Sequence, residues 1–263
     1  MIRRITFIGM SGCGKTFLSQ HLANNYGFFH YSVDWEITTI LYPQILQSVI
    51  EKIKDQSPFF KSLHEKFAIK TELSLTFDDL SAITSFVIPL DDNGKVAYHK
   101  FLHNQNLYKA AELQATKHFF SHARQAINLY KMQGAICDAT GSVCEVALED
   151  DEIIRDLKEQ TTVVYLQTDE THQEMLVERS KNAIKPILYN ENFLIKNLQE
   201  YYNTKNITQD FEIDRGFFLW VFPNLLKYRQ ECYAELVRQT NGIILNAEKF
   251  DVENIENLLF KSI

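Results

Sequence analysis

The sequence predicts an α/β protein built around one parallel β-sheet. Two observations carry this prediction: short apolar runs alternate with helical patterns along the chain, and a glycine-rich loop joins the first run to the first helix. Strands that alternate with helices indicate βαβ units, whose sheet is covered by helices on both faces. The runs expected to form strands are Ile5–Ile8, Phe28–Ser32, Ala135–Cys137, Thr162–Gln167 and Gly242–Leu245.

The glycine-rich loop after the first run is the most informative segment. It reads Gly9-Met10-Ser11-Gly12-Cys13-Gly14-Lys15-Thr16 and fits G-x-x-x-x-G-K-[ST], the phosphate-binding P-loop. In such a loop the backbone N–H groups surround phosphate oxygens, the lysine reaches the β- and γ-phosphates, and the hydroxyl ligates Mg²⁺. The sequence therefore predicts ATP and Mg²⁺ as cofactors, with a glycine-rich turn and an incidental Lys-Thr pair as the alternative. The residues expected at the triphosphate are Gly9, Ser11, Gly12, Cys13, Gly14, Lys15, Thr16 and Phe17.

Two helical patterns support the same architecture. After the loop, Phe17, Leu18, His21 and Leu22 recur at helical spacing, and Gly27 offers a C-cap. The order strand, glycine loop, helix is the one that phosphate binding requires. A longer apolar stripe precedes the third strand and consists of Leu113, Thr116, Phe120, Ala123, Ile127 and Tyr130.

The interval between the second and third strands is long. We interpret residues 38–130 as a mostly helical insertion, on the acceptor side of a single domain that spans residues 1–263. Within it, Asp91-Asp92-Asn93-Gly94 is a turn signal flanked by Phe86–Ile88 and Val96–Tyr98, and this pattern predicts a small β-hairpin.

Composition narrows the functional classes. A formal net charge of −7 argues against a broad nucleic-acid footprint, which depends on Lys and Arg that neutralise phosphates. No stretch approaches the roughly 18–20 apolar residues of a membrane span. The four cysteines show no metal-ligand spacing, and a disulfide at Cys13 would obstruct the P-loop. We therefore expect a cytoplasmic protein that binds neither nucleic acid nor membrane.

Asp138 directly follows the third strand. A carboxylate in that place suits a second Mg²⁺-organising position beside Thr16. The alternative is that Asp138 caps the next helix, since Asp is a favoured N-cap residue.

Four separated blocks together resemble the shikimate kinase family of P-loop kinases. They are Gly9–Thr16 with its helix and Tyr26-Gly27-Phe28-Phe29; Asp34-Trp35-Glu36-Ile37; Val163-Val164-Tyr165-Leu166 with Arg179 and Lys185-Pro186-Ile187-Leu188; and Arg229-Gln230-Glu231-Cys232-Tyr233. The resemblance implies a three-layer αβα sandwich with strand order 2-3-1-4-5 and a lid over residues 180–215. It also implies a kinase that moves the γ-phosphoryl group of ATP to a hydroxyl of a small, anionic molecule.

The resemblance also assigns roles. Asp34 would hold or deprotonate the acceptor hydroxyl, Arg229 would pair with an anionic acceptor, and Gly141 would approach it. Arg179 would lie against the nucleotide, and Lys185 would reach from the lid to the transferred phosphate. Alternatively, Asp34 caps a helix, Arg229 forms a surface salt bridge with Glu231 nearby, and Lys185 is a solvated loop charge.

The chain departs from the family pattern at several positions. Ser32 replaces the first carboxylate of the D-x-D signature, at a metal-organising position, and Lys185 replaces the lid arginine. The second substrate arginine has no clear counterpart, and Arg124, the one arginine between residues 38 and 130, is the candidate that we expect to bind the acceptor in its place. A nucleoside, nucleotide or sugar-acid kinase therefore remains an alternative. So does a nucleotide-dependent switch whose insertion binds a protein.

Overall fold

The computed structural model describes residues 3–66, 69, 71–72, 81–182, 188–205 and 212–247. Its centre is a five-stranded parallel sheet with the order β2-β4-β1-β5-β7. The strands are β1 (Arg3–Ile8), β2 (Phe28–Ser32), β4 (Gly134–Asp138), β5 (Thr162–Gln167) and β7 (Ile243–Asn246). Every expected strand is present, and the order confirms the 2-3-1-4-5 arrangement.

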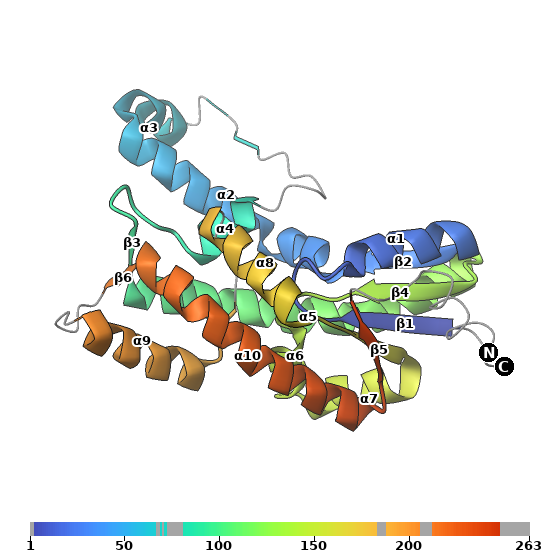
Figure 1. Ribbon diagram of the computed structural model, residues 1–263. Coiled ribbons are helices and arrows are strands. Elements are labelled where there is room, and N and C mark those ends of the chain that lie inside the picture. The colour runs from blue at the N-terminus through green and yellow to red at the C-terminus, as the bar shows by residue number, and fades with distance from the viewer. Residues whose placement is uncertain are drawn as a thin grey trace.

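Helices cover both faces of this sheet (Figure 1). On one face α1 (Lys15–Tyr26) packs Leu18 and Leu22 against Phe7 and Val164. The helix ends at Gly27, as expected, because that glycine adopts φ 64° and its N–H bonds the Ala23 carbonyl oxygen. The other face is covered by α5 (Tyr98–Tyr130), α6 (Val143–Ala147), α7 (Asp151–Gln160) and α10 (Arg215–Thr240). The three-layer αβα sandwich is confirmed.

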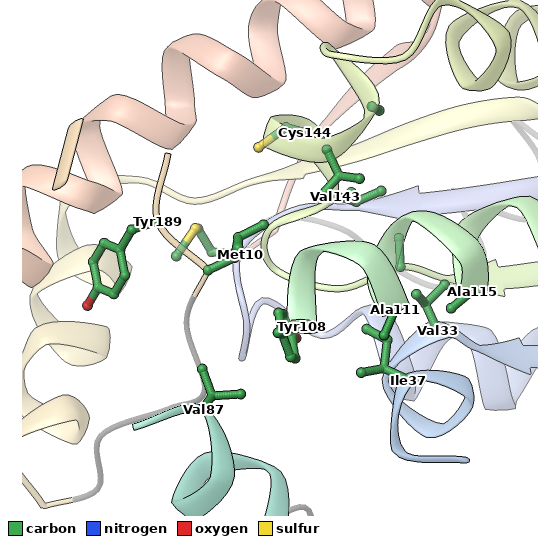
Figure 2. Close-up of a cluster of buried hydrophobic side chains, with 14 of the residues drawn as sticks. Met10, Val33, Ile37, Val87, Tyr108, Ala111, Ala115, Val143, Cys144 and Tyr189 are labelled. Atoms are coloured by element: carbon green, nitrogen blue, oxygen red, sulfur yellow. The ribbon is translucent and has the colours of Figure 1, made fainter. Parts of the chain in front are cut away.

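The segment between β2 and β4 is mostly helical in its described part. It contains α2 (Val33–Gln56), α3 (Pro58–Glu65), α4 (Ser81–Val87), the short strand β3 (Lys95–Ala97) and α5. Figure 1 shows α2 running away from the sheet, with α3 at its far end. In Figure 2, Ala111 and Ala115 of α5 face Val33 and Ile37 of α2, so small side chains let these two helices pack closely.

The expected hairpin around Asp91–Gly94 is wrong. The turn exists, with the Gly94 N–H 2.9 Å from the Asp91 oxygen. However, residues 81–87 form α4, because Ile83, Phe86 and Val87 bury one helical face. The strand β3 instead pairs antiparallel with β6 (Glu212–Asp214), which lies far along the chain.

The stripe expected before the third strand lies on α5. Thr116, Phe120, Ala123 and Ile127 are buried, whereas Tyr130 at the helix end is 73% exposed. The remaining helices are α8 (Glu170–Asn182) and α9 (Glu191–Lys205). Among the helices of the described segments, none combines the length and the hydropathy that a bilayer crossing demands.

Candidate active site

The P-loop bends between β1 and α1 at the carboxyl edge of the sheet, where parallel sheets bind ligands. Gly9, Gly12 and Gly14 have φ of 141°, 91° and 95°, a region that residues with a side chain rarely adopt. A Cβ on Gly9 would also lie 2.8 Å from the Leu166 carbonyl oxygen of β5. The glycines are thus required by the backbone path of this loop.

Lys15 lies inside the loop. Its ammonium group donates to the carbonyl oxygens of Gly9 at 2.8 Å and Met10 at 3.0 Å, and the residue is 6% exposed. Ser11, Gly12, Thr16 and Phe17 are exposed on the open side of the loop. The open side of the loop is therefore accessible to a ligand, while the Lys15 charge lies within the loop.

Cys13 contributes packing to this loop. The residue is 2% exposed, and burial raises the pKa of its thiol, which keeps the group neutral at physiological pH. Its Sγ would be 3.0 Å from a Cβ at Gly9. The side chain thus faces the core, and the Cys13 N–H donates to the Met10 carbonyl oxygen at 3.3 Å.

The expected metal residues are Ser32, Asp138 and Thr16. Ser32 and Asp138 are register partners on β2 and β4, at the same edge of the sheet. Asp138 does not cap the following helix, since Ser142 holds the N-cap position of α6, so that alternative is wrong. Instead its Oδ2 lies 3.8 Å from Nε2 of His30.

A magnesium ion fits this donor set only together with a nucleotide. No group of three His, Cys, Asp or Glu side chains within the described ranges could hold a metal ion. Mg²⁺ in nucleotide sites takes one or two protein ligands and completes its shell with phosphate oxygens and water. The Thr16 hydroxyl and the buried Asp138 carboxylate suit that role, whereas the Ser32 Oγ already accepts from the Trp35 N–H.

Arg179, the cation that the resemblance sets against the nucleotide, lies beside the P-loop. Arg179 lies on α8, and its Nη1 is 3.8 Å from the position of a Cβ on Gly12. Leu176, one turn earlier on α8, is 3.1 Å from the same position. The helix after β5 therefore borders the P-loop. Lys185, the expected lid cation, lies outside the described residues.

Asp34 lies in the first turn of α2, directly after β2. It does not cap that helix, because the N-cap is Ser32, and the capping alternative is wrong. Asp34 is partly exposed, and its charge contributes to the raised pKa of Glu112. The two carboxylates therefore lie near one another beyond the carboxyl ends of β2 and β4.

Arg229 is not a surface residue. It is 3% exposed, and its Nε donates to Glu145 at 2.6 Å. Its Nη1 and Nη2 donate to the carbonyl oxygens of Gly141 and Leu188 at 2.7 and 2.8 Å. Burial is the largest single effect and lowers the pKa of Arg229, but the interactions with Glu145, Tyr233 and Cys144 together outweigh it and raise the pKa. The expected surface salt bridge is wrong, and the expected acceptor-binding role is not supported, since this guanidinium joins α10 to α6 and to the chain after α8.

Arg124 is at the opposite edge of the sheet. Its Nη1 is 3.5 Å from the side-chain oxygen of Gln160, which Arg4 approaches at 3.4 Å. Arg4 lies near the start of β1, and Gln160 ends α7 just before β5. The prediction that Arg124 binds the acceptor is therefore wrong, because the P-loop follows the other end of β1.

Gly141 touches the P-loop. A Cβ at this position would lie 3.1 Å from the backbone nitrogen of Ser11. Its carbonyl oxygen accepts from Arg229 and, at 2.7 Å, from the Tyr233 hydroxyl. The residue is thus placed beside the phosphate loop, and its lack of a side chain allows the contact.

The sequence reasoning missed Glu112, a carboxylate on α5 that is 0% exposed. It accepts hydrogen bonds from the hydroxyls of Thr140 and Ser142. A signal was available, because Glu112 lies one turn before Thr116 on the buried face of the stripe. A charged residue on such a face is rarely buried without a specific partner.

One cleft of about 810 Å³ lies beyond the carboxyl end of β5, between α8 and α10. It is bordered by Gln167, Gln173 and Lys227, and by Asn246 at the end of β7. Because α8 contacts both this cleft and Gly12, the cleft adjoins the same edge of the sheet as the P-loop.

Comparisons with known proteins give matches among solved structures. Neither a protein-family model nor a curated protein matches the chain. A shikimate kinase from Acinetobacter baumannii in complex with shikimate matches with a TM-score of 0.49 and 15% identity, over 99% of this chain and 94% of that chain. Shikimate kinases from Bacteroides thetaiotaomicron and Aquifex aeolicus match with TM-scores of 0.42 and 0.41 and identities of 11% and 13%. The matches cover 98% of this chain in both cases, and 98% and 94% of the two structures.

These proteins belong to the family that the sequence resembles. Similarity at this level carries no argument about activity or substrate. The P-loop kinase-like fold follows from the chain's own strand order and loop geometry.

Proposed function

We propose that this protein is an ATP-dependent phosphotransferase that moves the γ-phosphoryl group to a hydroxyl of a small molecule. The observation that carries the proposal is the P-loop, whose three glycines have positive φ and whose lysine lies within the loop. Phosphoryl transfer depends mainly on positioning and on neutralising charge, and this loop supplies both.

In this proposal different residues bind the phosphates, hold the metal ion and accept the proton of the acceptor. Backbone N–H groups from Ser11 to Thr16 would hold the phosphates, and Lys15 would exchange its carbonyl partners for phosphate oxygens. Mg²⁺ held by Thr16 and, through water, by Asp138 would neutralise the charge that develops on the phosphates. Arg179 would add a cation from α8, and Asp34 would orient the acceptor hydroxyl and accept its proton.

The nucleoside part of ATP would bind in the cleft between α8 and α10. The cleft between α8 and α10 carries amide groups, including Gln167, Gln173 and Asn246. Amides can both donate to and accept from a base and a ribose. Its position beside α8, which also contacts Gly12, supports a nucleotide that extends from the P-loop toward this cleft.

The surroundings of Asp34 favour a different class of acceptor from the anionic one that the resemblance implies. An anionic acceptor was expected to meet Arg229 or Arg124, but Arg229 is buried and paired with Glu145, and Arg124 lies at the opposite edge of the sheet. Asp34 gives the acceptor side a carboxylate, and the charge of Arg229 is already paired with Glu145. A neutral polyol or an amino alcohol fits these surroundings better than a carboxylic acid, because a second negative charge there would be repelled.

The experiment compares Lys15→Ala and Asp34→Asn with the wild-type protein. With Lys15→Ala we expect binding of a non-hydrolysable ATP analogue to weaken by roughly tenfold or more. With Asp34→Asn we expect analogue binding to persist while product formation falls by about 10²–10⁴-fold. Calorimetric titration measures binding, and mass spectrometry of an acceptor panel of polyols, amino alcohols, nucleosides and hydroxy acids measures transfer.

Lys158→Ala on α7 is the matched control, since this exposed lysine lies at the other edge of the sheet. Unchanged analogue binding in Lys15→Ala would refute the proposal. Nucleotide turnover by the wild-type protein without any phosphorylated acceptor would refute the transfer step.

One observation favours a second candidate, a nucleotide-dependent switch that binds a protein. The helix α3 has no buried residue, and its Phe59 is 75% exposed. Exposed aromatic residues mark interfaces. Under this alternative Phe59→Ala would abolish partner capture, whereas under the kinase proposal it leaves acceptor phosphorylation unchanged.

A further inference from the structure

The buried carboxylate Glu112 bonds the loop that follows β4. The Ser142 Oγ lies 2.9 and 2.8 Å from its two carboxylate oxygens, and the Thr140 hydroxyl donates to Oε1. These two hydroxyls come from either side of Gly141. The carboxylate therefore holds the loop at both of its ends, from a helix that belongs to another layer of the fold.

Gly141 between them is fixed from the opposite direction as well. Its carbonyl oxygen accepts from Arg229 and from Tyr233, each at 2.7 Å. On its free side it meets Ser11, whose backbone nitrogen is 3.1 Å from the position of a Cβ on Gly141. The space between Gly141 and Ser11 is thus too small for a side chain, so the loop after β4 lies directly beside the P-loop.

The Ser11 N–H belongs to the phosphate-binding loop, so its placement bears on affinity. We propose that Glu112 is a positioning residue for the P-loop, on which it acts through Thr140 and Ser142 by holding Gly141 beside Ser11. The inference rests on the proposed nucleotide binding and adds a residue that touches neither the nucleotide nor the acceptor.

The charges around Glu112 make this link sensitive to pH. Burial raises its pKa to about 7, against the hydrogen bonds from Thr140 and Ser142 and the charge of Arg229 on α10. Asp34 on α2 raises it further. Tyr108, one turn earlier on α5, keeps its proton because burial raises its pKa. Glu145 on α6 is paired with Arg229.

The ionised carboxylate accepts from both hydroxyls, whereas the protonated form must place its own proton within the same cluster. We therefore expect nucleotide affinity to be higher above pH 7 than below it. The change should be centred where Glu112 titrates.

The experiment measures binding of the ATP analogue to wild-type protein and to Glu112→Gln at several values between pH 6 and 8. At pH 8 we expect Glu112→Gln to bind roughly tenfold more weakly, as the loss of a charged hydrogen-bond acceptor implies. The wild-type affinity should fall toward pH 6 more steeply than that of the variant. Titration of the ligand's own phosphates is common to both proteins and cancels in the comparison.

Glu149→Gln is the matched control, an exposed carboxylate paired with Lys109 at the surface. It should keep both the wild-type affinity and the wild-type pH profile. Ser142→Ala removes the same link from the loop side, serves if Glu112→Gln fails to fold, and should weaken binding by about threefold.

Wild-type affinity and pH profile in a folded Glu112→Gln protein would overturn this inference alone, as would wild-type affinity in Ser142→Ala. Failure of the wild-type protein to bind the analogue would overturn the proposed function, and this inference with it.

Discussion

Backbone geometry restricts which amino acid can stand at Gly9 and at Gly27, but it does so in two different ways. Gly9 has φ of 141° and lies so close to β5 that a Cβ on it would be 2.8 Å from a backbone oxygen of that strand. Gly27 also has positive φ, 64°, but the nearest neighbour of a Cβ there would be a flexible side-chain atom of Gln133 at 3.6 Å. Substitutions at Gly9 and Gly27 therefore separate two effects on stability: the cost of a positive φ, which both share, and the cost of a Cβ crowded against backbone, which applies to Gly9 alone.

We expect Gly9→Ala to lower the free energy of unfolding by about 3 kcal/mol, since strain and a backbone clash add. Gly27→Ala should lower it by about 1 kcal/mol, because only the left-handed conformation is penalised. Urea denaturation followed by circular dichroism measures both. Equal losses in the two variants would show that crowding against β5 contributes nothing.

The same residues show what a sequence can predict about the site. The P-loop could be located because its short motif fixes the local geometry, and the strand order brings Arg179 and Gly141 beside it, while the roles given to these two residues stay predictions. Arg229 and Arg124 could not be assigned, because the role of an arginine depends on which partner lies opposite. Glu145 and Gln160, which decide those roles, are remote in the sequence.

At the scale of elements, the alternation of apolar runs and helical patterns predicted the strands of the parallel sheet, but it did not predict the partner of β3. The turn at Asp91–Gly94 favours a local hairpin, but α4 uses the preceding residues to bury a helical face. The partner of β3 is β6, which lies just before α10, and a pairing over that separation leaves no local pattern. The resulting two-stranded sheet ties the insertion to the helix that carries Arg229.

Burial should hold this small sheet together more than its exposed ion pair does. Ile213 of β6 is 0% exposed, whereas Lys95 and Glu212 form a surface pair at 3.0 Å. We expect Ile213→Ala to lower the free energy of unfolding by about 2–4 kcal/mol. Lys95→Ala should lower it by less than about 1 kcal/mol, because solvent screens exposed pairs. Urea denaturation tests both, and an equal effect of the two changes would refute this ranking.

At the scale of the molecule, the insertion and the sheet share one core. A single cluster of buried side chains runs from Ile8 and Tyr31 in the sheet to Phe86 and Phe101 in the insertion. Met10 of the P-loop belongs to the same cluster, and Figure 2 shows it together with Tyr108 of α5. A shared core means that the insertion cannot unfold without exposing apolar surface of the sheet layer. If the chain is a single domain, the insertion and the sheet should therefore unfold together in one cooperative transition.

The two tryptophans test it, because Trp35 lies in the first turn of α2, the helix that continues into the insertion, and Trp220 lies on α10 beside Tyr201 of α9. In the variants Trp220→Phe and Trp35→Phe the remaining tryptophan reports on one region alone. We expect its fluorescence and the circular dichroism of the same variant to change at one urea concentration, as a cooperative two-state transition requires. If the Trp35 signal changed at lower urea than the circular dichroism, the insertion would be a separate folding unit. Because each variant is compared with its own circular dichroism, a stability difference between the two substitutions does not affect the result.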